Sequence, residues 1–341
     1  MVRRHGKLIF LGLLLITFCG NLFAQKIPVT VPIDSLITVG YATGSLKTIS
    51  GSVEKITETQ MNKDQITNPL EAIRGRVPGL TIQRATNGPA ALDAVRLRGT
   101  TSLTSGNDPL IIVDGVFGDL SMLTSIYPTD IESFTILKDA SETAQYGSRG
   151  ASGVIEVTTK KGRQGRTQVA YNGSFGISTV YKNLKMLSGN EFRQVASERG
   201  ISILDKGNNT NFQKEIEQTG LQQNHHIAFY GGSSESNYRV SLGFMDRQGV
   251  ILNEDMKNFT SNMNMNQKMF DGFLDCELGM FGSILKNHNL VDYQKTFYSA
   301  ATFNPTYPNH KDPVTNSWDG ITTASQITNP LAWMEVQDDD A

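Results

Sequence analysis

The stretch PTDIESFTILKDASETAQYGSRGASGVIEVTTKKG, residues 128–162, decides the fold of this chain. Ile131–Leu137 and Val154–Thr159 are rich in β-branched and apolar residues, which predicts two short strands. Asp139–Gln145 lies between them and predicts a helical turn built from small residues. We therefore expect a strand, a helical turn and a second strand in close succession.

Three glycines punctuate the passage into the second strand. Gly147, Gly150 and Gly153 stand at three-residue spacing, and each would cost about 1 kcal/mol inside a helix. The spacing favours a backbone that turns with positive φ or passes close to another backbone. The alternative is a phosphate-binding loop, which is weakly supported because no helix follows to direct its N-terminus at an anion.

The stretch resembles the end of the plug domain of TonB-dependent outer-membrane transporters, and it is most similar to the SusC/RagA branch. Three blocks carry the resemblance: Lys138-Asp139-Ala140, Tyr146-Gly147-Ser148-Arg149-Gly150-Ala151 and Thr158-Thr159-Lys160-Lys161-Gly162. The resemblance extends over roughly residues 34–190 and implies an α+β plug domain.

The residues before this stretch fit the same family. Thr67–Leu80 predicts a capped helix, with Asn68 as the accepting cap, Pro69 at the first helical position and Gly75 at the end. Such caps satisfy backbone groups that the helix leaves unpaired.

Strands are predicted at Thr81–Arg84 and Pro109–Val113, and Arg96–Leu103 alternates before it turns. Asp114 and Gly115 form a predicted turn. The plug-motif residues implied by the resemblance are Asn68, Pro69, Arg96, Arg98, Gly99, Asp114, Gly115, Lys138, Asp139, Tyr146, Gly147, Arg149 and Gly150.

Charged plug residues need partners, since an unpaired buried charge costs several kcal/mol. We expect Arg96, Arg98, Arg149, Glu132 and Asp139 to lock the plug to the barrel wall. The alternative is that these pairs must loosen during transport.

The N-terminus predicts a signal peptide over Met1–Ala24. Arg3, Arg4 and Lys7 precede an apolar run, Leu8–Cys19, that is too short to span a bilayer. The alternatives are a buried N-terminal helix and, because of Cys19, a lipoprotein signal.

The leader over residues 25–50 contains a short extended patch that resembles a TonB box. A segment of this kind offers its backbone to the edge of a partner's sheet, so β-forming residues suffice. The alternative is an ordinary first strand of the plug. The predicted box comprises Asp34, Ser35, Leu36, Ile37, Thr38, Val39, Gly40 and Tyr41.

From Thr167 onward, apolar and polar residues alternate in segments of about ten residues, which is typical of transmembrane β-strands. The outward residues of four segments are Val169, Tyr171, Phe175 and Ile177; Tyr238, Val240, Leu242 and Phe244; Phe259, Met263 and Met265; and Leu274, Cys276, Leu278, Met280 and Ile284. His225–Gly231 is a weaker fifth candidate. A soluble β-sandwich shares this period. Asn287–Ala341 predicts a long external loop.

Composition excludes several functions. A net charge of -2 provides no basic patch, so no nucleic-acid partner is expected. His225 and His226 are adjacent, and on a strand they would point to opposite faces, so they could not share a metal. No nucleophile elbow, Walker loop or zinc helix is present. We expect no enzyme, cofactor or metal site.

The predicted organisation is a signal peptide (1–24), a periplasmic leader with a TonB box (25–50), an α+β plug (51–165) and the first antiparallel strands of an incomplete transmembrane β-barrel with a long external loop (166–341). The resemblance implies import of oligosaccharides or peptides across the Gram-negative outer membrane, energised by TonB. The implied partners are TonB, a SusD-like surface lipoprotein, the substrate and outer-membrane lipid.

Family barrels have about 22 strands, whereas residues 168–341 can supply only a few. We therefore expect an N-terminal fragment or a truncated product. The alternative function is a plug module that binds TonB or signals without forming a pore.

Overall fold

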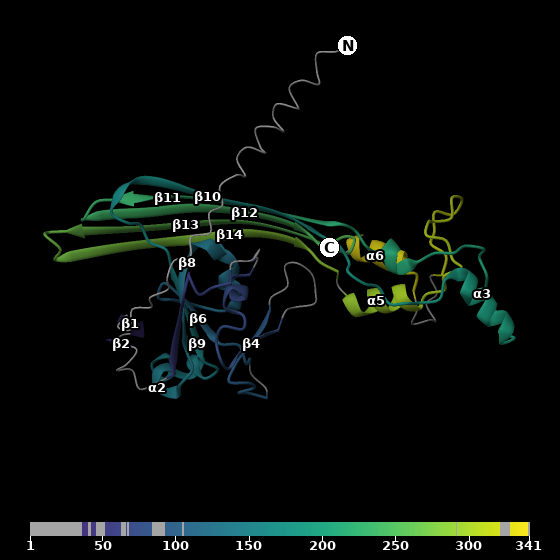
Figure 1. Ribbon diagram of the computed structural model, residues 1–341, viewed down its shortest axis with the longest axis horizontal. Helices are drawn as coiled ribbons and strands as arrows, with labels where there is room; N and C mark the ends of the chain where they lie inside the picture. Colours follow the sequence, from purple (N-terminus) through teal and green to yellow (C-terminus); the bar gives the residue numbers. More distant parts are fainter. Residues whose placement is uncertain are drawn as a thin grey trace, which may run out of the picture. The chain divides into compact units, whose positions relative to one another are not determined.

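The computed structural model describes residues 36–39, 42–45, 52–62, 66, 68–83, 93–103, 106–290, 292–320 and 328–339 (Figure 1). The chain comprises two units, residues 1–49 and 50–341. In the first unit, β1 (Leu36–Val39) pairs antiparallel with β2 (Ala42–Ser45). The predicted signal peptide lies outside the described residues.

The second unit begins with a mixed five-stranded sheet. Its order is β3 (Val53–Thr57), β8 (Ile131–Leu137), β9 (Val154–Thr159), β6 (Leu110–Val113) and β7 (Val116–Gly118). Only the β6–β9 pairing is parallel. A separate antiparallel pair joins β4 (Leu80–Gln83) and β5 (Ala94–Leu97). We call residues 52–162 the plug segment.

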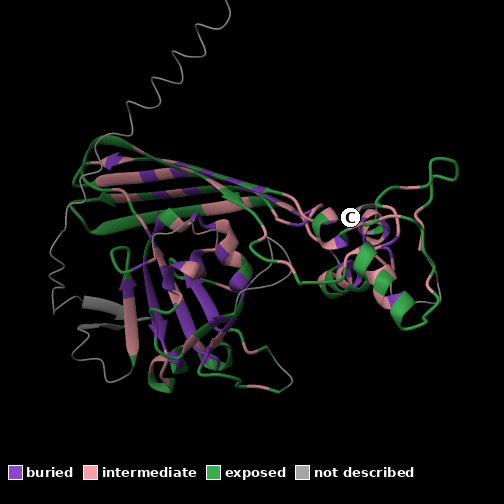
Figure 2. Cartoon of the chain, turned by 45° about the vertical axis from the view of Figure 1, so that its right-hand side comes forward, coloured by how far each residue is buried: buried purple, intermediate pink, exposed green. Residues whose placement is uncertain are grey.

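The plug segment has its own apolar core. Strands β8 and β9 are buried because they lie at the centre of the sheet, and Figure 2 shows buried residues concentrated there. Short 3₁₀ helices complete the segment: η2 (Pro69–Ile73), η3 (Leu120–Ser125) and η4 (Pro128–Asp130). Core members include Leu70, Ile73, Leu97, Ile111, Leu123, Phe134, Ile136, Ile155 and Val157.

The predicted helix near Asn68 is a 3₁₀ helix. The Asn68 side chain accepts from the backbone N–H of Leu70 at 3.0 Å, as the cap prediction requires. Pro69 opens the helix, and Gly75 follows it with φ of 71°. The Asn62 side chain donates to the carbonyls of Glu71 and Arg74, the latter just past the helix end, and so ties the segment before the helix to its C-terminal end.

The three glycines behave as predicted. Gly147 and Gly153 have φ of 59° and 92°. A Cβ at Gly150 would lie 2.7 Å from the carbonyl oxygen of Thr143, so that glycine permits a close backbone approach. The predicted helical turn is divided between α2 (Ala140–Thr143) and a 3₁₀ stretch, η5 (Ala144–Gly150), and the non-helical backbone of Gly147 kinks η5.

A second sheet, which we call the wall, contains five consecutive antiparallel strands. They are β10 (Gly165–Ser178), β11 (Gly220–Gly232), β12 (Ser236–Gln248), β13 (Asp255–Met269) and β14 (Leu274–His288). All five predicted strands are present, including the weaker candidate at β11. One face is apolar and exposed: Val169, Phe175 and Ile284 are each about 60% accessible (59%, 64% and 63%).

The connections at the two ends of the wall differ in length. The β11–β12 and β13–β14 turns are short, whereas β10 and β11 are joined by residues 179–219 with α3 (Gly189–Glu198) and α4 (Phe212–Glu215). Short turns at one end and long loops at the other are typical of outer-membrane proteins, with the long loops outside.

The segment predicted to be a long external loop, Asn287–Ala341, contains two helices that were not predicted, α5 (Tyr293–Thr302) and α6 (Pro330–Asp339). Asp292 caps α5 by accepting from the backbone N–H of Lys295. The helices pack in an apolar cluster at the long-loop end of the wall, formed by Phe212, Ile216, Ile251, Leu290, Ala300, Phe303 and Met334. None of the helices in the described part of the chain has the length and apolar character needed to cross a bilayer.

Candidate functional site: the seam between plug and wall

The plug segment meets the wall at a buried carboxylate. Asp130, the last residue of η4, is 2% exposed. It accepts hydrogen bonds from the Arg239 guanidinium at 2.8 Å and from the Ser241 hydroxyl at 2.6 Å, both on β12. His226 Nε2 on β11 lies 3.0 Å from the same carboxylate. One plug residue therefore joins two wall strands.

Strand geometry brings these wall residues together. Side chains alternate along a strand, so Arg239 and Ser241 share the inward face of β12. His226 lies opposite Gly243 in the β11–β12 register. A side chain at Gly243 would collide with the Tyr127 ring, so this glycine leaves room for Tyr127 to stack on His226, with ring centroids 4.6 Å apart.

The charges in this cluster are fixed by their surroundings. Burial would raise the pKa of Asp130, but His226, Ser241 and Arg239 together outweigh burial and lower it. Burial and the Asp130 charge raise the pKa of Tyr127 to about 12. Asp130 is therefore ionised and Tyr127 protonated at neutral pH.

Further contacts extend the seam across β13 and β14. Asn258 donates to the carbonyl of Thr124 at 3.0 Å, and Asn264 donates to the Thr159 hydroxyl at 3.1 Å. The hydroxyls of Ser125 and Ser283 are 3.0 Å apart, and Lys161 forms an ion pair with Glu277. The end of β9, the lysines that follow it, and helices η3 and η4 thus bind β11–β14.

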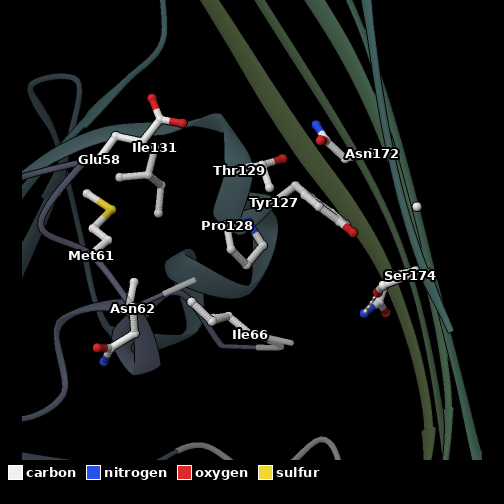
Figure 3. A pocket seen from close by; sticks show the side chains of 13 residues that line it. Glu58, Met61, Asn62, Ile66, Tyr127, Pro128, Thr129, Ile131, Asn172 and Ser174 are labelled. Carbon is white, nitrogen blue, oxygen red and sulfur yellow. Dashed lines mark hydrogen bonds between the residues drawn. The ribbon is translucent and has the colours of Figure 1, made fainter. Parts of the chain in front are cut away.

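A cavity of about 400 Å³ separates the plug segment from β10 and part of β11 (Figure 3). Asn172, Ser174 and Asn224 line it from the wall. Asn224 donates to the Ser174 hydroxyl at 3.1 Å, while its Oδ1 is buried without a hydrogen-bond partner in the described part of the chain. The plug side comprises Glu58, Met61, Asn62, Ile66, Ala72 and residues of the 127–131 segment.

Comparison with known proteins identifies this arrangement. The TonB-dependent receptor plug domain family matches residues 45–154. The TonB-dependent receptor SusC of Bacteroides thetaiotaomicron is 33% identical over 314 residues, which cover 87% of this chain and 31% of SusC. The chain belongs to the SusC/RagA-like TonB-dependent receptors.

Solved structures agree with this family. The RagAB peptide importer in its open-open state has a TM-score of 0.73 and 25% identity, covering 87% of this chain and 38% of that chain. Its closed-closed state has a TM-score of 0.69 and 25% identity, covering 83% and 37%. This receptor chain therefore spans about a third of the length of these relatives.

The plug-motif arginines of the receptor bind other plug residues. Arg96 forms an ion pair with Asp108, and Arg98 lies 3.3 Å from Asp139. Arg149 lies over the Phe117 ring, 5.8 Å from its centroid. The expectation that these arginines bind the barrel wall is therefore corrected for the five described wall strands, because all three arginines contact plug residues instead. They project from β5, the turn after it and η5, whereas η3, η4 and the β9 end face the wall.

The remaining motif residues also lie within the plug segment. Asp139 accepts from the backbone N–H of Ser52 at 2.8 Å, and Lys138 pairs with Glu54 at 3.0 Å, so both tie the 138–139 segment to the start of the plug. Asp114 accepts from the Thr159 hydroxyl at 2.6 Å. Tyr146 contacts Phe117 edge-on. Gly99 and Gly115 both have φ of 85°.

Sequence reasoning missed the cluster around Asp130. Arg239 could have pointed to it, because it is a charged residue on the inward face of a predicted strand, and a buried charge of this kind needs an oppositely charged partner. His225 and His226 do point to opposite faces, because His225 contacts Tyr171 while His226 faces the plug. The described residues contain no group of three or more histidine, cysteine or acidic side chains placed to hold a metal.

The predicted TonB box is partly described. Leu36–Val39 forms a strand that pairs with Ala42–Ser45, Leu36 opposite Ser45. Asp34, Ser35, Gly40 and Tyr41 lie outside the described residues. The box remains a prediction.

Proposed function

We propose that this chain supplies the plug and the first wall strands of a Gram-negative outer-membrane importer that is energised through TonB. The supporting observation is the buried seam. A plug with its own apolar core is tied by Asp130 to the polar face of a sheet whose other face is apolar and exposed. An apolar outer face suits lipid, and a polar inner face suits an enclosed plug.

In this proposal the chain is divided into four parts, each with its own role. Residues 1–24 direct export, 25–50 carry the TonB box, 51–165 form the plug and 166–341 begin the wall. The long connections at one end of the wall face outward and would meet a SusD-like lipoprotein and the substrate. Oligosaccharides and peptides are the proposed substrates, the latter in line with the RagAB peptide importer.

TonB is proposed to bind the box by strand addition. Leu36–Val39 is already extended, so its backbone can be offered to the edge of a partner sheet. Pulling on the leader would act first on β3, the first plug strand and an edge strand paired only with β8 among the described strands. The plug would then rearrange and the substrate would pass.

Deleting residues 34–41 tests this proposal. TonB's periplasmic domain should be captured by membranes holding the full-length protein and lost after the deletion, while substrate binding at the cell surface persists. The matched control deletes eight exposed or partly exposed residues, 309–316, and should retain TonB capture. Unchanged TonB capture after the box deletion would refute the proposal.

A further inference from the structure

We infer that solute passes the plug on the β10 side, through the cavity that Glu58, Met61 and Ile66 line opposite strands β10–β11, while the seam along β12–β14 stays closed. This inference rests on the proposed import function. It assigns the route and the chemistry of the passing solute to particular residues of this chain.

The seam is asymmetric. Every strand from β11 to β14 is bound to the plug segment by a side chain, including Arg239 on β12, Asn264 on β13 and Ser283 on β14. Among the described residues, no hydrogen bond or ion pair joins the plug segment to β10. The two surfaces separate most readily where no such contact has to be broken, and that is where the cavity lies.

Asp130, which fixes the plug segment to the wall, lies beside the strand of the plug that would have to move, β3. Asp130 directly precedes β8, and Arg239 and Ser241 hold it against the wall. Strand β3 is bonded only to β8 among the described strands, and Glu58 follows it directly. Displacing β3 with residues 58–62 would widen the cavity while β8 stays anchored.

On the side of strands β10 and β11, the residues that line the cavity with side chains are polar and uncharged. Asn172, Ser174 and Asn224 supply amide and hydroxyl groups, and the buried Asn224 Oδ1 has no protein partner within the described chain. The carboxylate of Glu58 is paired with Lys160 at 2.7 Å. The plug side adds apolar side chains, including Met61 and Ile66. The cavity therefore suits a neutral solute that forms hydrogen bonds on one side and apolar contacts on the other.

Cysteine labelling tests the route in full-length protein carrying Cys276→Ser, which removes the exposed free cysteine. Ser174→Cys places a thiol in the cavity, and Ser283→Cys places its matched control in the bound seam. In detergent, a neutral maleimide should label Ser174→Cys at least about tenfold faster than Ser283→Cys, and faster than a negatively charged maleimide does. Equal labelling of the two positions would overturn the route.

Energised cells supply a second measurement. With active TonB, labelling of Ser174→Cys should accelerate, while Ser283→Cys should change less than about twofold. Faster labelling of Ser283→Cys would overturn the route but leave the import function standing. Unchanged labelling at both positions, with TonB still captured, would have the same meaning. Loss of TonB capture itself would count against the import function, and the detergent experiment would then decide the route.

Discussion

Asp130 binds its three wall partners at the cost of desolvating a carboxylate. Its lowered pKa means that the folded state favours the ionised form, because His226, Ser241 and Arg239 replace the lost water. Its stabilising contribution is present above the ordinary aspartate pKa of 3.8 and is lost as pH falls through the lower folded value. Acid should therefore loosen the seam.

Replacing Asp130 with Asn should destabilise the protein by about 3–5 kcal/mol, because Arg239 would be left buried without its carboxylate. Thermal unfolding in detergent measures the loss. Glu132→Gln is the matched control, since Glu132 is exposed two residues away, and should change stability by less than about 0.5 kcal/mol. Adding Arg239→Met to Asp130→Asn should restore part of the loss; a strictly additive double variant would contradict the pairing.

Glu254, in the β12–β13 connection, should make stability fall as pH rises from about 4.5 to about 7. Burial raises its pKa to about 7, opposed by Arg247 and the backbone N–H of Ile251. In that pH window the folded state keeps a proton that the unfolded state has released, so unfolding becomes easier as pH rises.

Glu254→Gln should remove that slope and raise stability at pH 8, as measured by thermal unfolding across pH. Glu235→Gln changes an exposed carboxylate in the β11–β12 turn and should preserve the slope. An unaltered pH profile in Glu254→Gln would show that the carboxylate is not buried as described.

Among the elements, the passage from η5 into β9 depends most on glycine. Gly153→Ala should lower the free energy of unfolding by roughly 1–2 kcal/mol, because residue 153 has a φ of 92° that alanine adopts poorly. A further loss of about 1–3 kcal/mol is expected because the new methyl group collides with buried Leu97. Gly79→Ala is the control, because Gly79 has φ of 83° but open space around it. Urea unfolding should rank the two variants in that order, and equal losses would exclude the collision with Leu97.

Element prediction succeeded where the signal was local. The predicted bounds of β8 and β9 are those observed, and all five wall strands were expected from alternation. Helices α5 and α6 were missed because turn-forming residues dominate that segment, and their stability comes from packing against Phe212 and Ile251, which are distant in sequence.

The plug core and the apolar cluster at the long-loop end of the wall are separate, and a small third cluster joins Tyr127 of the plug to Met245 and Met256 of the wall. The plug core draws its buried members from residues 56–157, and Phe281 of the wall only packs against it while partly exposed. The cluster at the long-loop end of the wall contains no plug residue. The plug segment therefore has the packing needed to fold without the wall.

Residues 45–162 expressed without the rest of the chain should be monomeric and water-soluble. Asp130 would then lose Arg239 but regain water, so no buried charge would be left unpaired. Size-exclusion chromatography with light scattering, in the absence of detergent, measures the outcome. A fragment that stays dispersed only in detergent would show that the plug needs the wall to fold.

Local chemistry was sufficient for part of this structure. A strand exposes alternate residues to opposite faces, so the order of apolar and polar residues already identified the wall strands and their outward face. Glycine spacing likewise predicted the turn before β9, because only glycine adopts those backbone angles easily.

The contacts between plug and wall were decided by the tertiary structure. Asp130 and Arg239 are 109 positions apart, and no local rule selects that carboxylate over Glu132 or Asp139. Their pairing depends on how the plug is packed against β11–β14, and the same packing leaves the cavity beside β10. Sequence therefore determined the strands and the faces they present, whereas three-dimensional packing determined which polar groups meet.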